Sequence, residues 1–405
     1  MLPEPALTLT LPSIHDATVL DCRIYHPASL LSTTSHHPPP WSRHAAVVAH
    51  PYAPMGGSYD DPIVETVAAQ LLRKGYLVGT FNFRGAGASA GSTSWTGRPE
   101  RGDFGSVVGF LVYYVHHLDP FADMEERQPR EAPVLLMAGY SYGAMVATQL
   151  PPLGDILQRF EAPAAGSEAA QIRARAEELA RQQNAILGSA RAAALEHRSL
   201  QPRSPRTGVR VGGGDVSPRR SHDSWGRRSF SLEAEEKIRR GVSELIEKTK
   251  GRHGHSGRKA SGHHGREDGA EEALAPVREL MVPRAAYLLI SPLQGFITHL
   301  ATMSLLPSSL SLRGSRGGGG GGGEDEAAEA KLVRRPTLAV YGDRDVFVGA
   351  GKLRAWAGRL QGQRGSRFEG CEVRSAGHFW AEEGVLGRME RAVAEFAGGL
   401  VGEGV

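Results

Sequence analysis

Apolar segments recur along two parts of the chain and are missing from a long stretch between them. They occur regularly over residues 1–150 and again over residues 283–405, and they disappear from about 160 to 275. A stretch without apolar periodicity cannot bury enough surface to offset the entropy of ordering its backbone. We therefore expect one folded domain built from 1–150 and 283–405, with a disordered insertion with possible helices over 151–282.

The insertion also carries most of the positive charge. Residues 198–266 contain 17 Lys and Arg against 7 Asp and Glu, an excess of +10, although the whole chain carries only +3. Inside the insertion, Glu168 to about His197 and Leu232 to about Lys250 are rich in helix formers. By charge alone the basic segment suits an acidic partner, but its few aromatic residues argue against specific nucleic-acid recognition.

Other compositional features narrow the class of protein. The histidines at 253, 255, 263 and 264 are interpreted as low-complexity sequence rather than metal ligands. Residues 313–330, which include seven consecutive glycines at 317–323, are interpreted as a flexible spacer. Two cysteines, Cys22 and Cys371, exclude a disulfide scaffold and suit a reducing compartment, so we expect a cytoplasmic location. No run approaches the roughly 18 apolar residues of a membrane span, and the N-terminus lacks the pattern of a signal peptide.

Strand-like and helix-like segments alternate in the two outer parts. Strand patterns lie at 7–11, 19–25, 45–49, 76–83, 134–138, 285–290, 337–341 and 371–374. Helical spacing lies at 63–74, 104–115, from 142, 352–359 and 382–397. Such alternation predicts an α/β fold, a mostly parallel sheet with helices on both faces, to which the opening hairpin adds an antiparallel edge.

The pattern Gly-x-Ser-x-Gly occurs twice. Ser141 follows an apolar strand and precedes a helix of small residues, whereas Ser89 follows a strand but precedes a polar loop. A nucleophilic serine on a sharp strand-to-helix turn needs the first context, and its flanking glycines let the backbones pass closely. We therefore predict Ser141 as a nucleophile and interpret Ser89 as part of a glycine-rich turn.

A nucleophilic serine needs a base and a carboxylate that orients the base. Among the 16 histidines, His378 is distinguished by its place just after the last short strand. The strand at 337–341 ends in Gly-Asp-Arg-Asp, which offers Asp345 and Asp343, although both also suit a plain turn. All lie at carboxyl ends of strands, where open α/β sheets build their sites.

Acyl transfer also requires two N–H donors for the oxygen that becomes negatively charged. The first expected donor is the backbone N–H of Tyr142, directly after the serine. The second should come from the loop after the strand at 45–49, with Tyr52 as first choice and Ala53 as second, because Pro51 has no N–H to donate.

Taken in order, these motifs resemble the α/β-hydrolase superfamily, and within it a group of small serine hydrolases related to dienelactone hydrolases and Xaa-Pro dipeptidyl peptidases. The resemblance covers about 45–150 and 284–397. The matching residues are His50-Pro51 with Gly56-Gly57, Phe81–Gly85 with Gly87 and Ser89, Gly97, Glu100 and Asp103, Gly139–Ala144, Ser291-Pro292, Gly342 with Asp345, and Gly377-His378.

The resemblance implies a triad of Ser141, Asp345 and His378, with Asp345 favoured over Asp343. It implies a serine hydrolase of esterase, thioesterase or peptidase type that acts on a small ester, thioester or amide, without a metal or organic cofactor. The alternative is a catalytically silent, hydrolase-like binding protein whose basic insertion recruits a partner.

For the other charged residues near these motifs, we expect roles in the fold rather than in chemistry. Glu100 and Asp103 suit a helix start, where carboxylates meet the helix dipole, and Arg84 is expected to hold the loop of Ser89. The insertion enters the amino end of a strand, so we expect it to lie away from the catalytic face and not to act as a lid. The apolar segment 291–312 is predicted either to line an acyl pocket or to pack on the sheet.

Overall fold

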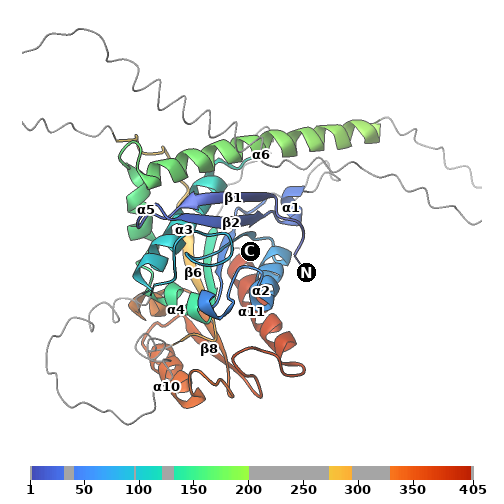
Figure 1. Ribbon diagram of the computed structural model, residues 1–405. Helices are drawn as coiled ribbons and strands as arrows, with labels where there is room; N and C mark the ends of the chain where they lie inside the picture. The colour runs from blue at the N-terminus through green and yellow to red at the C-terminus, as the bar shows by residue number, and fades with distance from the viewer. Residues whose placement is uncertain are drawn as a thin grey trace, which may run out of the picture. The chain divides into compact units, whose positions relative to one another are not determined.

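An eight-stranded sheet forms the centre of the computed structural model (Figure 1). The structure describes residues 2–31, 41–94, 97–120, 132–199, 273–293 and 329–402. These residues belong to one of two units of the chain, the unit that comprises Met1–Gln201 and Glu271–Val405. Nearly all of the basic segment, the glycine spacer and most of 291–312 lie outside the described residues, so the predictions of disorder and of an acyl pocket stay predictions.

The order of the strands across the sheet is β1-β2-β4-β3-β5-β6-β7-β8. The first two pairs, β1 with β2 and β2 with β4, are antiparallel, and all later pairs are parallel. This arrangement confirms the predicted fold class. The strands are β1 Leu7–Pro12, β2 Val19–Tyr25, β3 Ala45–Ala49, β4 Leu77–Phe81, β5 Val134–Tyr140, β6 Arg284–Ile290, β7 Thr337–Gly342 and β8 Phe368–Val373.

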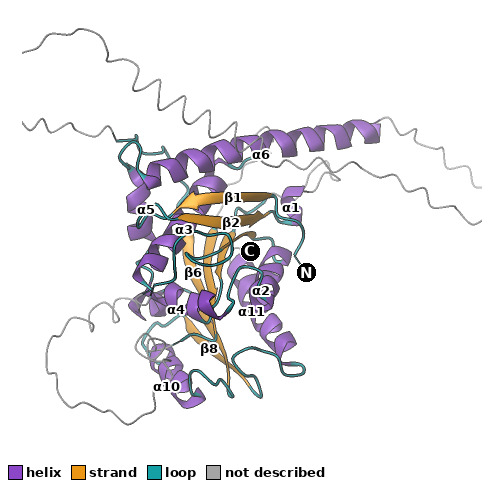
Figure 2. Cartoon of the chain, viewed as in Figure 1, coloured by secondary structure: helices purple, strands orange, loops and turns teal. Residues whose placement is uncertain are grey.

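Successive residues of the central strands enter two separate apolar cores, because side chains alternate across a sheet. In β3, Val47 belongs to one core and Val48 to the other. Helices therefore cover both faces (Figure 2). Those with buried residues in the core of Val47 are α1 Ala28–Leu31, α3 Arg98–His117, α4 Tyr142–Gln149, α5 Leu153–Glu161, α6 Glu168–Ser199, the short helix 329–334 and α10 Ala350–Gln361. Those in the core of Val48 are α2 Pro62–Arg73 and α11 Val385–Gly402.

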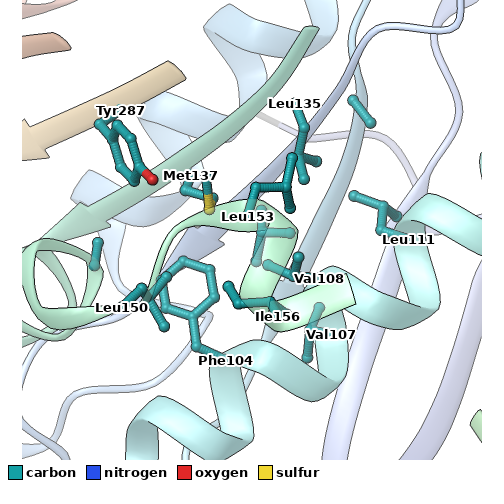
Figure 3. Close-up of a cluster of buried hydrophobic side chains, with 14 of the residues drawn as sticks. Phe104, Val107, Val108, Leu111, Leu135, Met137, Leu150, Leu153, Ile156 and Tyr287 are labelled. Carbon is teal, nitrogen blue, oxygen red and sulfur yellow. The ribbon is translucent and has the colours of Figure 1, made fainter. Parts of the chain in front are cut away.

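The larger core fixes the helix that follows Ser141. Figure 3 shows Phe104 and Val108 of α3 beside Met137 of β5 and Leu150 at the end of α4. Phe104, Val108 and Met137 are fully buried. Burial of apolar area contributes about 25 cal/mol per Å², so this contact holds α3 and α4 firmly against the sheet.

Two helices lie within the region 151–282, which the sequence assigns to an insertion with possible helices. Helices α5 and α6 lie in the same unit as the sheet, and Ile172, Ala176 and Ala180 of α6 are completely buried. Their spacing of four residues places them on one face of the helix, which packs against α3. The contact extends past the middle of the helix, where the Asn184 side chain donates to the His117 carbonyl of α3 at 2.9 Å, while Ile186 is 55% exposed. Helix α6 agrees with the stretch of helix formers from Glu168 to about His197, and the bounds of the insertion stay a prediction.

The segment that precedes α6 pairs with the segment that precedes β6. Ala164 and Ala273 form an isolated antiparallel bridge, and the backbone N–H of Leu274 donates to the Pro163 carbonyl at 2.9 Å. The Arg173 guanidinium of α6 donates to the Ala275 carbonyl and so joins α6 to the segment that precedes β6. Within the ranges given above, no helix combines the length and apolar character that crossing a membrane requires.

Candidate active site

Ser141 occupies a strained turn between β5 and α4. Its φ of 55° and ψ of −112° lie in a region that non-glycine residues rarely adopt, at a cost of about 1–3 kcal/mol. The surrounding structure fixes this conformation, because the Ser141 N–H donates to the Ile290 carbonyl at 2.8 Å and the Met145 N–H donates to the Ser141 carbonyl. The turn therefore holds the serine side chain at the carboxyl edge of the parallel strands.

The two glycines that flank Ser141 are required by close backbone contacts. A Cβ on Gly139 would lie 2.3 Å from the carbonyl carbon of Gly143, and a Cβ on Gly143 would lie 2.6 Å from the Ala49 carbonyl oxygen. Neither contact leaves room for a side chain. The Gly-x-Ser-x-Gly pattern thus reflects the approach of α4 to both β5 and the end of β3.

His378 lies between Ser141 and Asp345 and contacts both. Its Nε2 is 2.8 Å from the Ser141 Oγ, and its Nδ1 is 2.7 Å from the Asp345 Oδ2. All three residues are buried, with exposed fractions of 6%, 3% and 7% for Ser141, His378 and Asp345. The structure therefore brings together the serine, histidine and aspartate that the sequence singled out.

The two carboxylates of the loop after β7 have different partners. Asp345 contacts His378 through Oδ2, while its Oδ1 accepts the N–H groups of Phe347 and Val348 at 2.8 and 3.0 Å. Asp343 instead accepts the Ser375 N–H at 2.6 Å and thereby holds the loop that leads to His378. Asp345 is thus the carboxylate on the imidazole, and Asp343 is a support of the neighbouring turn.

Further residues, not identified from the sequence, hold His378 in place. The Tyr140 hydroxyl donates to the His378 carbonyl at 3.0 Å, and burial raises the pKa of this phenol, which keeps its proton. The next residue but one, Trp380, is buried with a φ of 57° and donates its indole N–H to the Ser291 Oγ at 3.1 Å. Contacts to backbone atoms leave little trace in a sequence, although Tyr140 stands inside the serine motif.

A buried lysine closes the far end of α4. The Lys331 Nζ, in the short helix 329–334, donates to the Ala147 carbonyl at 3.1 Å and also to the Leu150 carbonyl. A cation suits the carbonyl end of a helix dipole, but desolvation lowers the lysine pKa to about 7. Lys331 therefore supports the helix whose amino end begins at Tyr142; nothing in the sequence pattern pointed to it.

The loop after β3 places Tyr52 close to Tyr142. Ala49, the last residue of β3, pairs with Gly139 of β5, and Gly139 lies two residues before Ser141. The loop after β3 therefore starts beside the turn of Ser141. The rings of Tyr52 and Tyr142 have centroids 5.3 Å apart. Within the described part of the chain, the backbone N–H of neither tyrosine donates to a protein acceptor. Ala53, the second choice from the sequence, begins the short 3-10 turn η1 (Ala53–Met55).

Ser89 has a structural role in this fold. Its Oγ donates to the Asn82 carbonyl at 2.7 Å and accepts the Asp21 N–H at 2.8 Å. Both bonds are buried, and they tie the loop after β4 to β2. The hydroxyl is therefore fully engaged by backbone groups, in agreement with its interpretation as part of a turn.

The charged residues near this loop are engaged with one another. The Arg84 guanidinium donates to Asp103 at 2.7 and 3.0 Å and to Asp16 at 2.8 Å, so it holds the loop rather than offering an anion site. Glu100, in the first turn of α3, accepts the N–H and the hydroxyl of Ser94 at 2.6 and 2.5 Å. Asp103 thus binds the Arg84 guanidinium, whereas the sequence predicted only a role at the start of a helix.

The chain was compared with curated proteins and with solved structures. No curated protein matches. A serine hydrolase homologue from Coxiella burnetii is 12% identical, with a TM-score of 0.44 and coverage of 98% of this chain and 99% of that chain. A serine hydrolase without lid from Xanthomonas campestris is 16% identical, with a TM-score of 0.42 and coverage of 98% and 95%. The esterase Pf2001 from Pyrococcus furiosus is 13% identical, with a TM-score of 0.43 and coverage of 96% and 90%.

A model of a protein family also matches part of the chain. The model of the X-Pro dipeptidyl-peptidase (S15) family matches residues 16–227, just over half of the 405 residues. The matched span includes β3, β5 and the turn of Ser141. The chain is therefore a hydrolase of the α/β-hydrolase superfamily and belongs to the X-Pro dipeptidyl-peptidase (S15) family.

Proposed function

We propose that the chain is a serine hydrolase that transfers an acyl group to Ser141. The observation that carries the proposal is the buried hydrogen-bonded chain from the Ser141 Oγ through His378 to Asp345, with contacts of 2.8 and 2.7 Å. A serine hydroxyl is a weak nucleophile unless a base accepts its proton as it attacks. This arrangement supplies the base and the carboxylate that orients it.

In the first half-reaction, the Ser141 Oγ attacks the carbonyl carbon of the substrate while its proton moves to the His378 Nε2. The carbonyl π electrons move onto oxygen, and the N–H groups of Tyr142 and Tyr52 bind the resulting oxyanion. Asp345 accepts the Nδ1 proton of the imidazolium in a hydrogen bond and stabilises its charge. When the oxyanion collapses, the bond to the leaving group breaks and that group takes the proton from Nε2.

In the second half-reaction, water attacks the acyl-enzyme and gives a proton to the His378 Nε2. The bond between the acyl carbon and the Ser141 Oγ then breaks, and the Oγ recovers its proton from the imidazolium. A carboxylic acid leaves. The cycle restores Ser141 and His378 and requires no other reactant than water.

The surroundings of His378 favour a substrate with an apolar group. Phe347 contacts the His378 ring at a centroid distance of 4.6 Å, and Phe379 contacts Phe347 at 5.8 Å. Phe379 is 58% exposed and Val346, beside Asp345, is 76% exposed. Large apolar side chains with this exposure directly beside the triad supply a surface on which the acyl or leaving group of an ester, thioester or amide can rest.

Labelling with a fluorophosphonate tests the proposal, because the probe phosphonylates an activated serine. We expect the wild type to be labelled, and labelling to be lost in Ser141→Ala and His378→Ala and strongly slowed in Asp345→Asn. The control Ser89→Ala should be labelled like the wild type. A folded wild-type protein that resists the probe would contradict the proposal.

A substrate panel then separates the three bond types. A p-nitrophenyl ester, a thioester and an X-Pro p-nitroanilide, the last suggested by the family's name, are compared at equal concentration of active sites. That concentration is measured by titrating a separate sample with the fluorophosphonate. The bond type with the highest kcat/KM defines the class. Turnover that persists in Ser141→Ala would exclude acyl transfer to this residue.

A further inference from the structure

His50 is a buried histidine whose two ring nitrogens both contact the backbone of the site. It directly follows β3 and is 0% exposed. Its Nδ1 lies 2.6 Å from the Pro51 carbonyl oxygen, and its Nε2 lies 2.8 Å from the backbone nitrogen of Phe83. Because the Phe83 N–H can only donate, Nε2 accepts and the single ring proton resides on Nδ1, which donates to Pro51.

The Pro51 carbonyl and the Tyr52 N–H belong to one peptide unit. That unit is planar and trans, since the described residues include no cis peptide bond. In a trans peptide the C=O and the N–H point in opposite directions. A side chain that fixes the Pro51 oxygen therefore also fixes the direction of the Tyr52 N–H.

Backbone packing restrains the same carbonyl from another direction. A Cβ on Gly57 would lie 2.3 Å from the Pro51 oxygen, so the chain at Gly57 passes directly against it. The carbonyl of Tyr52 is also occupied, because it accepts the N–H groups of Met55 and Gly57 at 3.1 and 3.2 Å. Among the described residues, the Tyr52 N–H has no protein acceptor, while the carbonyl groups on both sides of it are held.

We propose that His50 is a positioning residue that aims the Tyr52 N–H at the oxyanion by holding the Pro51 carbonyl. The inference rests on the proposed function, because an oxyanion forms only if Ser141 attacks a carbonyl carbon. Burial lowers the pKa of His50 to about 4, which keeps the ring in the neutral state that both hydrogen bonds require. His50 does not touch the substrate and acts through the peptide that follows it.

Two substitutions separate the two hydrogen bonds of His50. In His50→Asn, the side-chain amide places a donor near the Nδ1 position and can keep the bond to Pro51. In His50→Gln, the longer side chain places an acceptor near the Nε2 position and keeps only the bond to Phe83. Comparing the two variants therefore distinguishes a role in holding the Pro51 carbonyl from a role in holding the loop of Phe83.

His44 provides the matched control at the opposite end of β3. It is also buried, its Nδ1 accepts the Val134 N–H at 2.9 Å, and desolvation lowers its pKa to about 4. It lies far in sequence from every residue of the triad and at the amino end of the strand. His44→Gln should therefore lower the melting temperature without changing turnover.

The readouts are kcat and KM for p-nitrophenyl acetate, the inhibition constant of a trifluoromethyl ketone, and the melting temperature of the full chain. The Ser141 Oγ adds to the ketone carbon, and the resulting hemiketal carries a negative oxygen where the oxyanion of the substrate would form. Since loss of one oxyanion donor lowers kcat about 10²- to 10³-fold, misalignment in His50→Gln should lower it about 10- to 100-fold with little change in KM. The ketone should bind more weakly by a similar factor.

His50→Asn should keep most of the wild-type kcat, measured per fluorophosphonate-titrated site so that unfolded protein is not counted. The inference would be overturned by wild-type kcat in His50→Gln, or by equal losses of kcat in the two His50 variants. A wild type that is neither labelled nor active would instead overturn the proposed function, and this inference with it.

Discussion

The chain contains two Gly-x-Ser-x-Gly turns, one after β4 and one after β5, which are parallel strands on either side of β3. The two turns differ in every contact of the serine. The Ser89 Oγ is bound by two backbone groups, whereas the Ser141 Oγ contacts an imidazole. After Ser89, the Ala90 N–H donates to the Val19 carbonyl. After Ser141, the Tyr142 N–H has no protein acceptor among the described residues. The pattern marks a tight turn in both places, and only the unoccupied donors and the base make one of them a candidate for catalysis.

The glycines in the two turns also serve different contacts. At Gly139 an added Cβ would strike the backbone of Gly143, while at Gly87, which has a φ of 52°, it would strike the side-chain nitrogen of Asn82. A side chain can move aside, but the backbone of a packed helix cannot. The turn of Ser141 is therefore the more rigid of the two.

The largest expected difference between the turns is in turnover. Loss of a triad serine lowers kcat by about 10⁴- to 10⁶-fold, so Ser141→Ala should be almost inactive. Ser89→Ala should keep its kcat but lose about 1–3 kcal/mol in free energy of unfolding, because the buried Asp21 N–H loses its acceptor. Ester hydrolysis and urea unfolding of both variants measure the two effects. Equal activity of the variants would show that the two turns do not differ in function.

Deletion of one N–H tests the donors beside Ser141. Tyr52 has a φ of −64°, which proline adopts without strain, and its N–H makes no bond within the described protein. Tyr52→Pro should therefore lower kcat about 10²-fold with little loss of stability. Tyr52→Ala, which keeps the N–H and removes the ring, is the control. If the proline and alanine variants turned over equally fast, Tyr52 would not be an oxyanion donor.

The paired glycines should differ in stability. Gly139→Ala places a Cβ against backbone and should cost about 2–4 kcal/mol in free energy of unfolding. Gly87→Ala meets a movable side chain and a strained φ, and should cost about 1–2 kcal/mol. Chemical unfolding followed by circular dichroism measures both. A larger loss at Gly87 would contradict the argument that the turn of Ser141 is the more rigid.

The smallest effect concerns acid stability, through three buried histidines. His26, His44 and His50 are buried, and desolvation lowers each pKa from 6.5 to about 4. Between these values the unfolded chain binds more protons than the folded chain, so stability is lost as the pH falls from 6.5 to 4, by at most about 1.4 kcal/mol per pH unit for each group. The melting temperature of His50→Gln should fall less steeply over this range than that of the wild type. A parallel decline would assign the acid sensitivity to other groups.

The strands and the three triad candidates could be predicted because each carries a local signal. Ser141 and Asp345 each follow a buried, continuous apolar strand, and His378 follows the last short strand of the chain. The choice between Asp343 and Asp345 needed the resemblance, since both suit a turn and only the three-dimensional partners, Ser375 and His378, separate them.

The supports of the site could not be predicted in the same way. His50, Tyr140 and Lys331 act on backbone carbonyl groups, which every residue has, so no residue type at a partner position reveals the contact. Helix α6 was assigned to the insertion for a related reason. Its buried alanines are neutral in composition, and their role depends on the neighbouring α3.

The backbone conformation of Ser141 lowers the stability of the fold and places the serine for activity. Its φ of 55° and ψ of −112° are easy for glycine and costly for serine. A Ser141→Gly chain would relieve this strain and could unfold less readily than the wild type while losing the hydroxyl. Random mutation under selection for thermal resistance alone would accordingly tend to discard the serine, and a selection scheme for hardier variants of this chain has to reward turnover in the same round.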